Sequence, residues 1–148
     1  MSKMPLIPFE TTLHVKDTCL CLHVQRAARA IARRFDEALR SLDITNGQFS
    51  LLMSLNRPAP PNMGSVASLL AMDRTTLTAA LKPLERRGLI EIFPDPEDRR
   101  SRRLRLTQEG AALLARAIPI WKALHEALDP VLGEGGPDRL RADLLTLA

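Results

Sequence analysis

The segment from Asp73 to Gly110 constrains the fold of this chain more than any other, because three structural signals follow one another within it. Asp73 is a preferred helix-capping residue, and leucines recur after it at the spacings of four and three that mark an amphipathic helix. Gly88 stands where a glycine in the left-handed conformation ends such a helix. Apolar residues then alternate with polar ones at 90–92 and again at 103–106, which is the period of a β-strand. The sequence therefore predicts a helix, a tight stop and a β-hairpin.

The predicted helix has two chemically different sides. Its leucine stripe, Leu77, Leu81 and Leu84, forms the side that faces a core. The other side carries short hydroxyls, a methyl group and two cations: Arg74, Thr75, Thr78, Ala79 and Lys82. Side chains of these kinds contact base edges and phosphates in DNA. We therefore expect this side to face a groove of double-stranded DNA.

The loop between the two predicted strands is dominated by arginine. It reads PDPEDRRSRR and carries Arg99, Arg100, Arg102 and Arg103, so it is too polar to be buried. An isolated run of charge usually does no more than solvate a loop. Directly behind a helix-turn-helix segment, the same run favours contact with the phosphates or the narrow minor groove of DNA.

Helical patterns precede this segment. Apolar residues spaced by three or four predict one long amphipathic helix over residues 17–42. Thr45 and Gln48 form a capping box for a second helix, which must end before the proline-rich loop at 57–64. Residues 65–71 predict a short third helix, which a tight turn joins to the helix that starts after Asp73. This order of elements is typical of a helix-turn-helix.

The C-terminal region predicts a helix that is apolar on two sides. It opens at Thr107 and ends at 133–137, and a short last helix follows over 138–148. A helix with two apolar sides must be covered on both of them. In a chain of 148 residues the simplest second cover is another copy, so we expect a homodimer. Apolar residues near the N-terminus are expected to join this contact: Leu6, Ile7 and Phe9.

Composition fits one globular domain spanning residues 1–148. Hydrophobic residues make up 45% of the chain and charged residues 26%, and the net charge is +4. No apolar run approaches the roughly 20 residues needed to span a bilayer, and the N-terminus lacks a signal-peptide core. We therefore expect a cytoplasmic protein with no membrane partner. Without a glycine-rich phosphate loop, a nucleophile elbow or clustered carboxylates, we also expect no enzyme activity and no cofactor.

The chain resembles the MarR family of winged helix-turn-helix regulators over roughly residues 17–130. The motifs that carry the resemblance are ITNGQFSLL, DRTTLTAALKPLERRGLI and DPEDRRSRRLRLTQEG. It implies a mostly α fold with a small β-hairpin wing, an α+β class. Residues 45–106 would form the winged helix-turn-helix lobe, and 17–42 and 107–148 the helical dimerisation lobe. Family members typically repress transcription by binding a short inverted repeat as a dimer, with no enzyme activity of their own.

The resemblance also assigns roles to individual residues. The polar side of the 73–87 helix, Arg74, Thr75, Thr78, Ala79 and Lys82, is similar to the family's major-groove and adjacent phosphate contacts. In the wing, Asp98 resembles an acid that orients Arg100, and Arg99 or Arg100 resembles the minor-groove contact, with Arg102 beside them. Many members release DNA when a small aromatic or anionic effector fills a crevice. For that crevice the expected lining residues are His23, Arg26 and Trp121.

Cys19 supports an alternative function, because CLCLH resembles the position of the cysteine in peroxide-sensing members of the family. Those members place tyrosines near the cysteine, whereas this chain has no tyrosine, and its second cysteine, Cys21, lies only two residues away. These departures favour an unreactive, reduced thiol. We expect no metal site from Cys19 with His14, His23 or His125, since no carboxylates support them. A winged helix that binds only protein is a further alternative, against which the arginine-rich wing argues.

Overall fold

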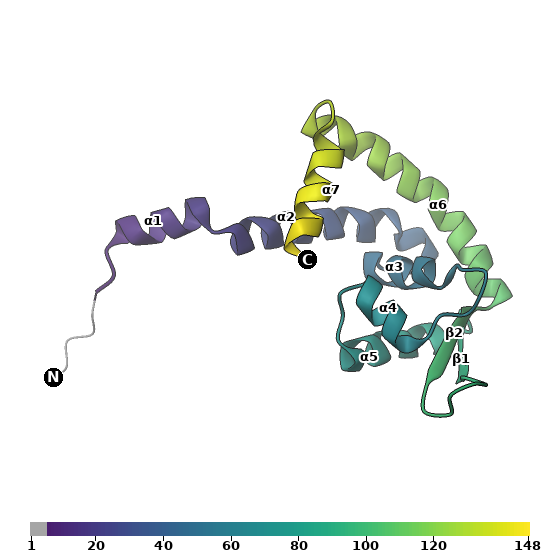
Figure 1. Cartoon of the computed structure of the whole chain (residues 1–148). Helices are drawn as coiled ribbons and strands as arrows, with labels where there is room; N and C mark the ends of the chain where they lie inside the picture. Colours follow the sequence, from purple (N-terminus) through teal and green to yellow (C-terminus); the bar gives the residue numbers. More distant parts are fainter. Residues whose placement is uncertain (1–5) are drawn as a thin grey trace. The chain divides into compact units, whose positions relative to one another are not determined.

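The computed structural model describes residues 6–148 and divides into two compact units (Figure 1). The first ends at Arg34, and the second spans Phe35–Ala148. Each unit is described by itself below. The second unit holds the helix-turn-helix, the hairpin and the C-terminal helices.

Most of the helix that the sequence predicts over residues 17–42 is present, and a separate helix precedes it. Helix α1 spans Phe9–Thr18, and α2 spans Leu20–Ala38. Between them Cys19 adopts an extended conformation, with φ −68° and ψ 110°, and its Sγ accepts a hydrogen bond from the Leu22 N–H at 3.4 Å. The predicted start at Asp17 was wrong, because Cys19 caps α2 and the helix begins at Leu20. At the other end the chain leaves α2 through a short 3-10 helix, η1, at Arg40–Leu42.

The end of α2 is joined to the start of α3, which spans Asn46–Leu55. Asp36 Oδ1 accepts hydrogen bonds from the Asn46 N–H at 2.7 Å and from its side-chain amide at 2.8 Å. These bonds, the backbone one foremost, hold the pKa of Asp36 below its usual value. The predicted capping box is confirmed, since Thr45 and Gln48 each accept from the backbone N–H of the other.

The helix-turn-helix consists of α4, Met63–Leu69, and α5, Arg74–Arg86. We predicted that α4 starts at Ser65, but Asn62 caps it two residues earlier by accepting from the Ser65 N–H at 2.8 Å. Asp73 caps α5 as predicted, because its carboxylate accepts from the Thr76 N–H at 2.7 Å. At the end of α5, Gly88 has φ 70°, which confirms the left-handed stop.

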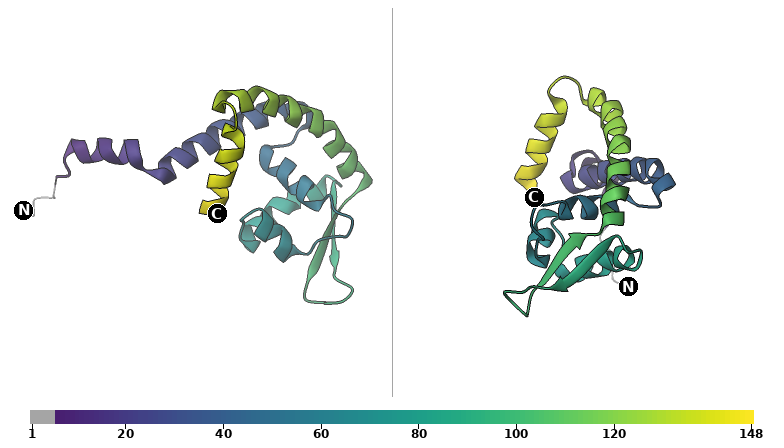
Figure 2. Two further views of the ribbon diagram at one scale, coloured as in Figure 1. Left: turned by 45° about the horizontal axis from the view of Figure 1, so that its top comes forward. Right: turned by 90° about the vertical axis from the view of Figure 1, so that its right-hand side faces the viewer.

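The hairpin consists of β1, Ile90–Pro94, and β2, Arg102–Leu106. The strands are antiparallel, with Ile90 opposite Leu106 and Ile92 opposite Leu104, as the alternation predicts. Both views in Figure 2 show the hairpin extending away from the helices of its unit. The loop at 95–101 is therefore carried by two paired strands.

Helix α6 spans Gln108–Leu128 and starts at the predicted cap, Thr107, whose hydroxyl oxygen accepts from the Gly110 N–H at 3.0 Å. It ends before the predicted 133–137, because the chain tightens into a 3-10 helix, η2, at Asp129–Leu132. The last helix, α7, spans Gly136–Leu147. Within residues 6–148, no helix combines the length and the apolar composition needed to cross a membrane.

The hydrophobic core of the second unit lies between α3, α4, α5, the hairpin and the first half of α6. Its most deeply buried side chains come from each of these neighbours and include Leu52, Val66, Leu77, Leu81, Leu84 and Leu104. Burial of a leucine side chain contributes about 1.5 to 3 kcal/mol. The leucine stripe of α5 is thus fixed against the core, and the rotation of that helix is fixed with it.

Gly110 generates a stability prediction. A Cβ at this position would overlap the carbonyl oxygen of Leu89 and lie 2.9 Å from its carbonyl carbon, so α6 would have to shift away from the hairpin. Overpacking of this kind costs roughly 1 to 3 kcal/mol or more. We expect Gly110→Ala to lower the free energy of unfolding by at least that amount in a urea titration.

Gly47→Ala is the matched control. Its Cβ would meet nothing closer than the Thr45 hydroxyl at 3.9 Å, so helix propensity should leave the stability unchanged or raise it by up to about 1 kcal/mol. Equal unfolding free energies for the two variants would contradict the close packing of Gly110 on Leu89.

Candidate nucleic-acid interface

Helix α5 presents opposite sides to the core and to solvent. Leu77, Leu81 and Leu84 are each 0% exposed. The predicted DNA-facing residues are all exposed: Arg74, Thr75, Thr78, Ala79 and Lys82. Two hydrogen bonds from Thr76, that of its backbone N–H foremost, hold the pKa of Asp73 below its usual value, so the start of the helix carries an ionised cap. The cap and the buried leucines therefore fix the orientation of the exposed side of α5.

The turn at the tip of the hairpin is ordered by two aspartates. Asp95 Oδ1 accepts from the Glu97 N–H, and Asp98 Oδ1 accepts from the Arg100 N–H, each at 3.0 Å. The resemblance to regulators suggested that Asp98 orients Arg100, and the structure places that contact on the backbone of Arg100 rather than on its guanidinium group. The three predicted wing contacts are exposed, with Arg99 and Arg100 on this turn and Arg102 at the start of β2.

Arg103 stabilises the hairpin and the loop beside it, a role that the sequence did not predict. Its Nε donates to Asp95 Oδ2 at 2.9 Å, and its Nη1 donates to the carbonyl oxygen of Pro60 at 2.9 Å. The Leu104 N–H also donates to the Pro61 carbonyl oxygen, so the proline-rich loop lies along β2. The only signal in the sequence is an acid and an arginine at the ends of paired strands, and it does not identify the carbonyl partner.

Asp95 is the buried end of this ion pair, with 6% of its surface exposed. The hydrogen bond from the Glu97 N–H is the main cause that holds its pKa below the usual value, and Arg103 adds to the effect against the opposing influence of burial. The remaining strand arginine, Arg105, pairs with Glu91 at 2.9 Å and lies 4.5 Å from the centre of the Phe93 ring. Two of the five arginines at 99–105 thus stabilise the hairpin itself.

A small cavity lies where the start of α4, the first turns of α5 and the wing turn meet. Its volume is about 250 Å³, and its lining includes Arg74, Arg100 and Arg102 together with Thr78, Ser101 and Gly64. The cavity brings three predicted DNA-contacting arginines from two separate elements to one place. No acidic residue belongs to the lining.

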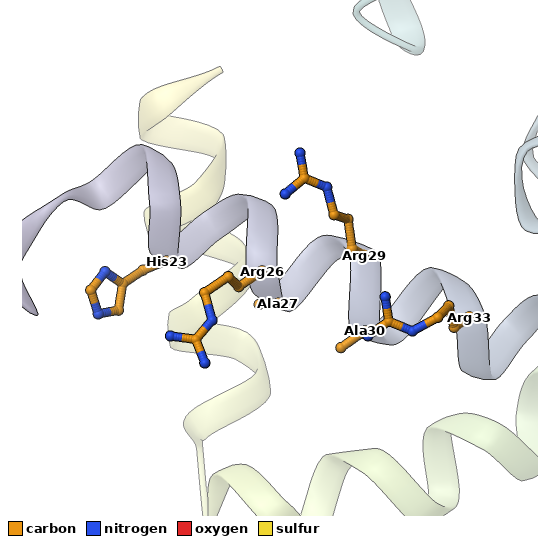
Figure 3. Close-up of a pocket in the computed structure, with 6 residues that line it drawn as sticks. All are labelled: His23, Arg26, Ala27, Arg29, Ala30 and Arg33. Atoms are coloured by element: carbon orange, nitrogen blue, oxygen red, sulfur yellow. The ribbon is translucent and has the colours of Figure 1, made fainter. Parts of the chain in front are cut away.

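The predicted effector residues line two other cavities. His23 and Arg26 line one of about 580 Å³ along α2, together with Arg29 and Arg33. Figure 3 shows His23 and Arg26 on one side of the helix and Arg29 on the other, so these cations fan out rather than converge. Trp121 lines a cavity of about 520 Å³ in the second unit. Its grouping with His23 and Arg26 stays a prediction.

Within residues 6–148, no side-chain base forms a hydrogen bond with the sulfur of Cys19. The thiol is half-buried and accepts the Leu22 N–H, whereas the His23 Nδ1 donates to the Cys19 carbonyl oxygen at 2.7 Å. Cys21 is exposed, and both cysteines are free. Across residues 6–148, the structure gathers no group of three or more His, Cys, Asp or Glu side chains that could hold a metal ion.

Comparison with known proteins places this geometry in a family. The MarR family model matches residues 44–101. The HTH-type transcriptional repressor NicR of Pseudomonas putida is 34% identical over 83 residues, which are 56% of this chain and about half, 52%, of the length of NicR. The organic hydroperoxide resistance transcriptional regulator of Bacillus subtilis is 32% identical over 108 residues, 72% of this chain and 74% of the relative. The chain belongs to the MarR family. Its relatives are transcription regulators, not enzymes, and it is a DNA-binding regulator of the same kind.

A solved structure of the family agrees with the fold. The transcriptional regulator MosR of M. tuberculosis, in complex with DNA, is 34% identical with a TM-score of 0.78, and the match covers 88% of this chain and 93% of MosR. The mostly α fold with a two-stranded wing is therefore confirmed as the MarR winged helix-turn-helix fold.

The ion pair at the base of the wing predicts a pH dependence. The pKa of Asp95 is lower in the folded chain than in the unfolded one, so its contribution to stability is present above the unfolded value near 4 and is lost as the pH falls through the folded value. We expect Asp95→Asn to lower the thermal unfolding midpoint at pH 7 and the difference from the parent chain to shrink as the pH falls below about 4.

Asp138→Asn provides the comparison for this measurement. Asp138 also pairs with an arginine, Arg141, but the side chain of Asp138 is 88% exposed. An exposed pair of this kind contributes little. If the two variants unfold at the same temperature throughout the pH range, the Asp95 pair does not stabilise the wing.

Proposed function

We propose that this MarR family member is a repressor that binds a pseudo-palindromic DNA site as a homodimer and releases it when a small anionic molecule binds. The single observation that carries the DNA-binding part is the exposed side of α5, which lies opposite the buried leucines and next to the arginine turn of the wing. NicR, whose name describes a repressor, supports the direction of control. Because the partner is chromosomal DNA, the protein acts in the cytoplasm.

The proposed reading of DNA follows from the size and chemistry of the two elements. An α-helix fits the major groove, so Thr75, Thr78 and Ala79 face base edges there. Arg74 and Lys82 stand at the margins of that side and suit the adjacent phosphates. At the wing, Arg99 and Arg100 suit the narrow minor groove or its phosphates, where negative potential is strongest.

Exposed apolar residues support the homodimer. On α2 part of the predicted apolar stripe is exposed in the single chain, namely Leu20, Val24 and Ile31, and on α7 Leu145 is 76% exposed. Near the N-terminus Leu6, Ile7 and Phe9 are exposed as well. Surfaces of this kind are typically covered in an oligomer. A second copy of the chain would cover them, and its two-fold symmetry would match the two halves of a palindromic site.

We expect light scattering at micromolar concentration to give the mass of two chains. The DNA site that the protein selects from a random library of duplexes should then have half-sites whose centres lie about 34 to 36 Å apart, which is one helical turn of the duplex. Leu145→Glu, which places a charge on the α7 part of the proposed contact, should shift the mass towards that of one chain. A monomeric parent protein would rule the homodimer out.

The proposed effector site is the cavity along α2. Its lining, which also includes His23, carries the positive charges of Arg26, Arg29 and Arg33 and no acid. This charge favours an anionic molecule, although the side chains do not converge on one point. Trp121 lines a separate cavity in the second unit. Its part in the effector site, and the expectation of an aromatic effector, therefore rest on the family resemblance.

Two alternatives are less well supported. The Bacillus subtilis relative is named for organic hydroperoxide resistance, but in this chain His23 bonds the Cys19 carbonyl oxygen and no tyrosine exists to bond the thiol. A winged helix that binds only protein does not account for an exposed helix side and an arginine turn on the same face as the helix-turn-helix. We therefore keep the effector-responsive repressor as the proposed function.

Substitutions on α5 test the function. A duplex selected from a random library by the parent protein gives the preferred site, and an unrelated duplex of equal length gives the background. We expect Thr75→Ala and Thr78→Ala each to cost roughly 1 to 3 kcal/mol on the preferred site and less on the background, because base contacts specify sequence.

Lys82→Ala is the matched control on the same exposed side. As a phosphate contact it should weaken binding to both duplexes alike and reduce the dependence on salt. Equal losses on both duplexes for the threonine variants would demote these residues to backbone contacts, and a parent chain that binds neither duplex would refute the proposed function.

A further inference from the structure

The cavity between α4, α5 and the wing turn concentrates positive charge. Arg74 comes from α5, and Arg100 and Arg102 come from the wing, yet all three line one space of about 250 Å³. The neighbouring acids have other partners. Asp98 accepts the Arg100 N–H, Asp95 pairs with Arg103, and Asp73 caps α5, so none of them neutralises the three guanidinium groups within the lining. Like charges repel when brought together, and an anion in this space would relieve that repulsion.

The backbone, rather than chance contact of flexible side chains, brings these arginines together. Arg102 is fixed in β2 by its pairing with Pro94. The Ser101 N–H donates to the Asp98 carbonyl oxygen at 2.9 Å and closes the wing turn. Next to α4, Asn62 forms a β-bridge with Arg103, so the loop that lines one wall is bound to the strand that lines another. The walls of the cavity therefore belong to elements that are bonded to one another.

Gly64 leaves room for one of the guanidinium groups. A Cβ at this position would lie 3.1 Å from Arg74 Nη2, closer than nearly all real Cβ contacts. The Arg74 side chain thus lies against a bare stretch of helix backbone inside the lining. A glycine here leaves room for the Arg74 guanidinium group beside the helix backbone.

The size and charge of the cavity suit one small oxyanion. Its volume falls below the range of about 300 to 1,000 Å³ typical of sites for drug-sized ligands. Guanidinium groups match the oxygens of a phosphate in bidentate geometry, and the hydroxyl of Ser101 adds a short-range donor. A duplex presents such a group at every backbone position.

We propose that this cavity binds a single phosphate group. In the DNA complex this group is one backbone phosphate, held jointly by α5 and the wing. The proposal rests on the proposed function for the source of the phosphate, since free inorganic phosphate has the same chemistry. A shared phosphate ties the position of α5 in one groove to that of the wing in the next. It thereby sets the register of both elements on the duplex.

The dependence of DNA affinity on salt counts the phosphates that the protein neutralises. For a duplex, the logarithm of the affinity falls with the logarithm of the salt concentration with a slope of about −0.9 per phosphate. On a random-sequence duplex we compare the parent chain with the triple variant Arg74→Ala/Arg100→Ala/Arg102→Ala. If the three arginines share one phosphate, the slope should lose about 0.9 per DNA-binding lobe. If each neutralises its own, it should lose about 2.7.

Titration of the DNA-free parent chain with inorganic phosphate, at constant ionic strength in chloride, separates the two sources. Nuclear magnetic resonance of the arginine Nε–H groups should show the signals of Arg74, Arg100 and Arg102 moving together. Arg99 is the matched control, because it stands on the same turn outside the lining and its signal should stay. Gly64→Ala should weaken the response by displacing Arg74.

The outcomes are distinct. A slope loss near 0.9 identifies a DNA phosphate as the occupant. An unchanged slope together with the phosphate response identifies free phosphate as the occupant and keeps the site. A loss near 2.7, or an unchanged slope with no response to phosphate, overturns the proposal. If the parent chain binds no duplex at low salt, the proposed function fails and the phosphate titration alone decides on the site, as it also does if the triple variant does not fold.

Discussion

The burial of the leucine stripe of α5 is the interaction on which the DNA-binding surface depends. Leu77, Leu81 and Leu84 are completely buried, so the helix cannot rotate about its axis without exposing them. Each contributes about 1.5 to 3 kcal/mol by burial, and together they outweigh the roughly 0 to 1 kcal/mol typical of an exposed charge pair. Which residues α5 presents to a groove is thus decided from inside the protein, and the polar side contributes chemistry without having to position itself.

The arginines of the wing divide between structure and binding. Arg103 and Arg105 form ion pairs within the hairpin, and Arg103 also donates a hydrogen bond to the Pro60 carbonyl oxygen in the proline-rich loop. Arg99 and Arg100 remain exposed on a turn whose backbone N–H groups donate hydrogen bonds to Asp95 and Asp98, and Arg102 is exposed beside it at the start of β2. The first group gives the hairpin a fixed base, and the second gives it a charged end. Net charge alone, at +4, describes neither part.

Elements whose signals are local in sequence were predicted well. Thr45, Asp73 and Thr107 cap helices in the structure as the sequence indicates, and Gly88 ends α5, because a cap and its partner lie within four residues of each other. The strands and their register followed from alternation in the same way. The exposed side of α5 needed only the periodicity of one helix.

Signals that depend on a competing cap or a distant partner were missed. The helix predicted from Asp17 starts at Leu20, because the Cys19 thiol caps it there, and α4 starts at Met63, capped by Asn62, rather than at Ser65. The contact from Arg103 to the Pro60 carbonyl spans 43 residues, and no local pattern contains it. Likewise, the meeting of Arg74 with Arg100 and Arg102 follows from tertiary packing, although each residue alone was a candidate.

The junction at Thr107 has a mechanical consequence. Its hydroxyl donates to the Gly88 carbonyl oxygen at 2.6 Å while accepting from the Gly110 N–H, and its own N–H donates to the Leu89 carbonyl oxygen at 3.1 Å. Thr107 thereby joins the end of α5, the start of the hairpin and the start of α6 through three hydrogen bonds. A tilt of α6 would therefore move α5 and the hairpin with it, and in the proposed homodimer a change of angle along this long helix would change the distance between the two copies of α5.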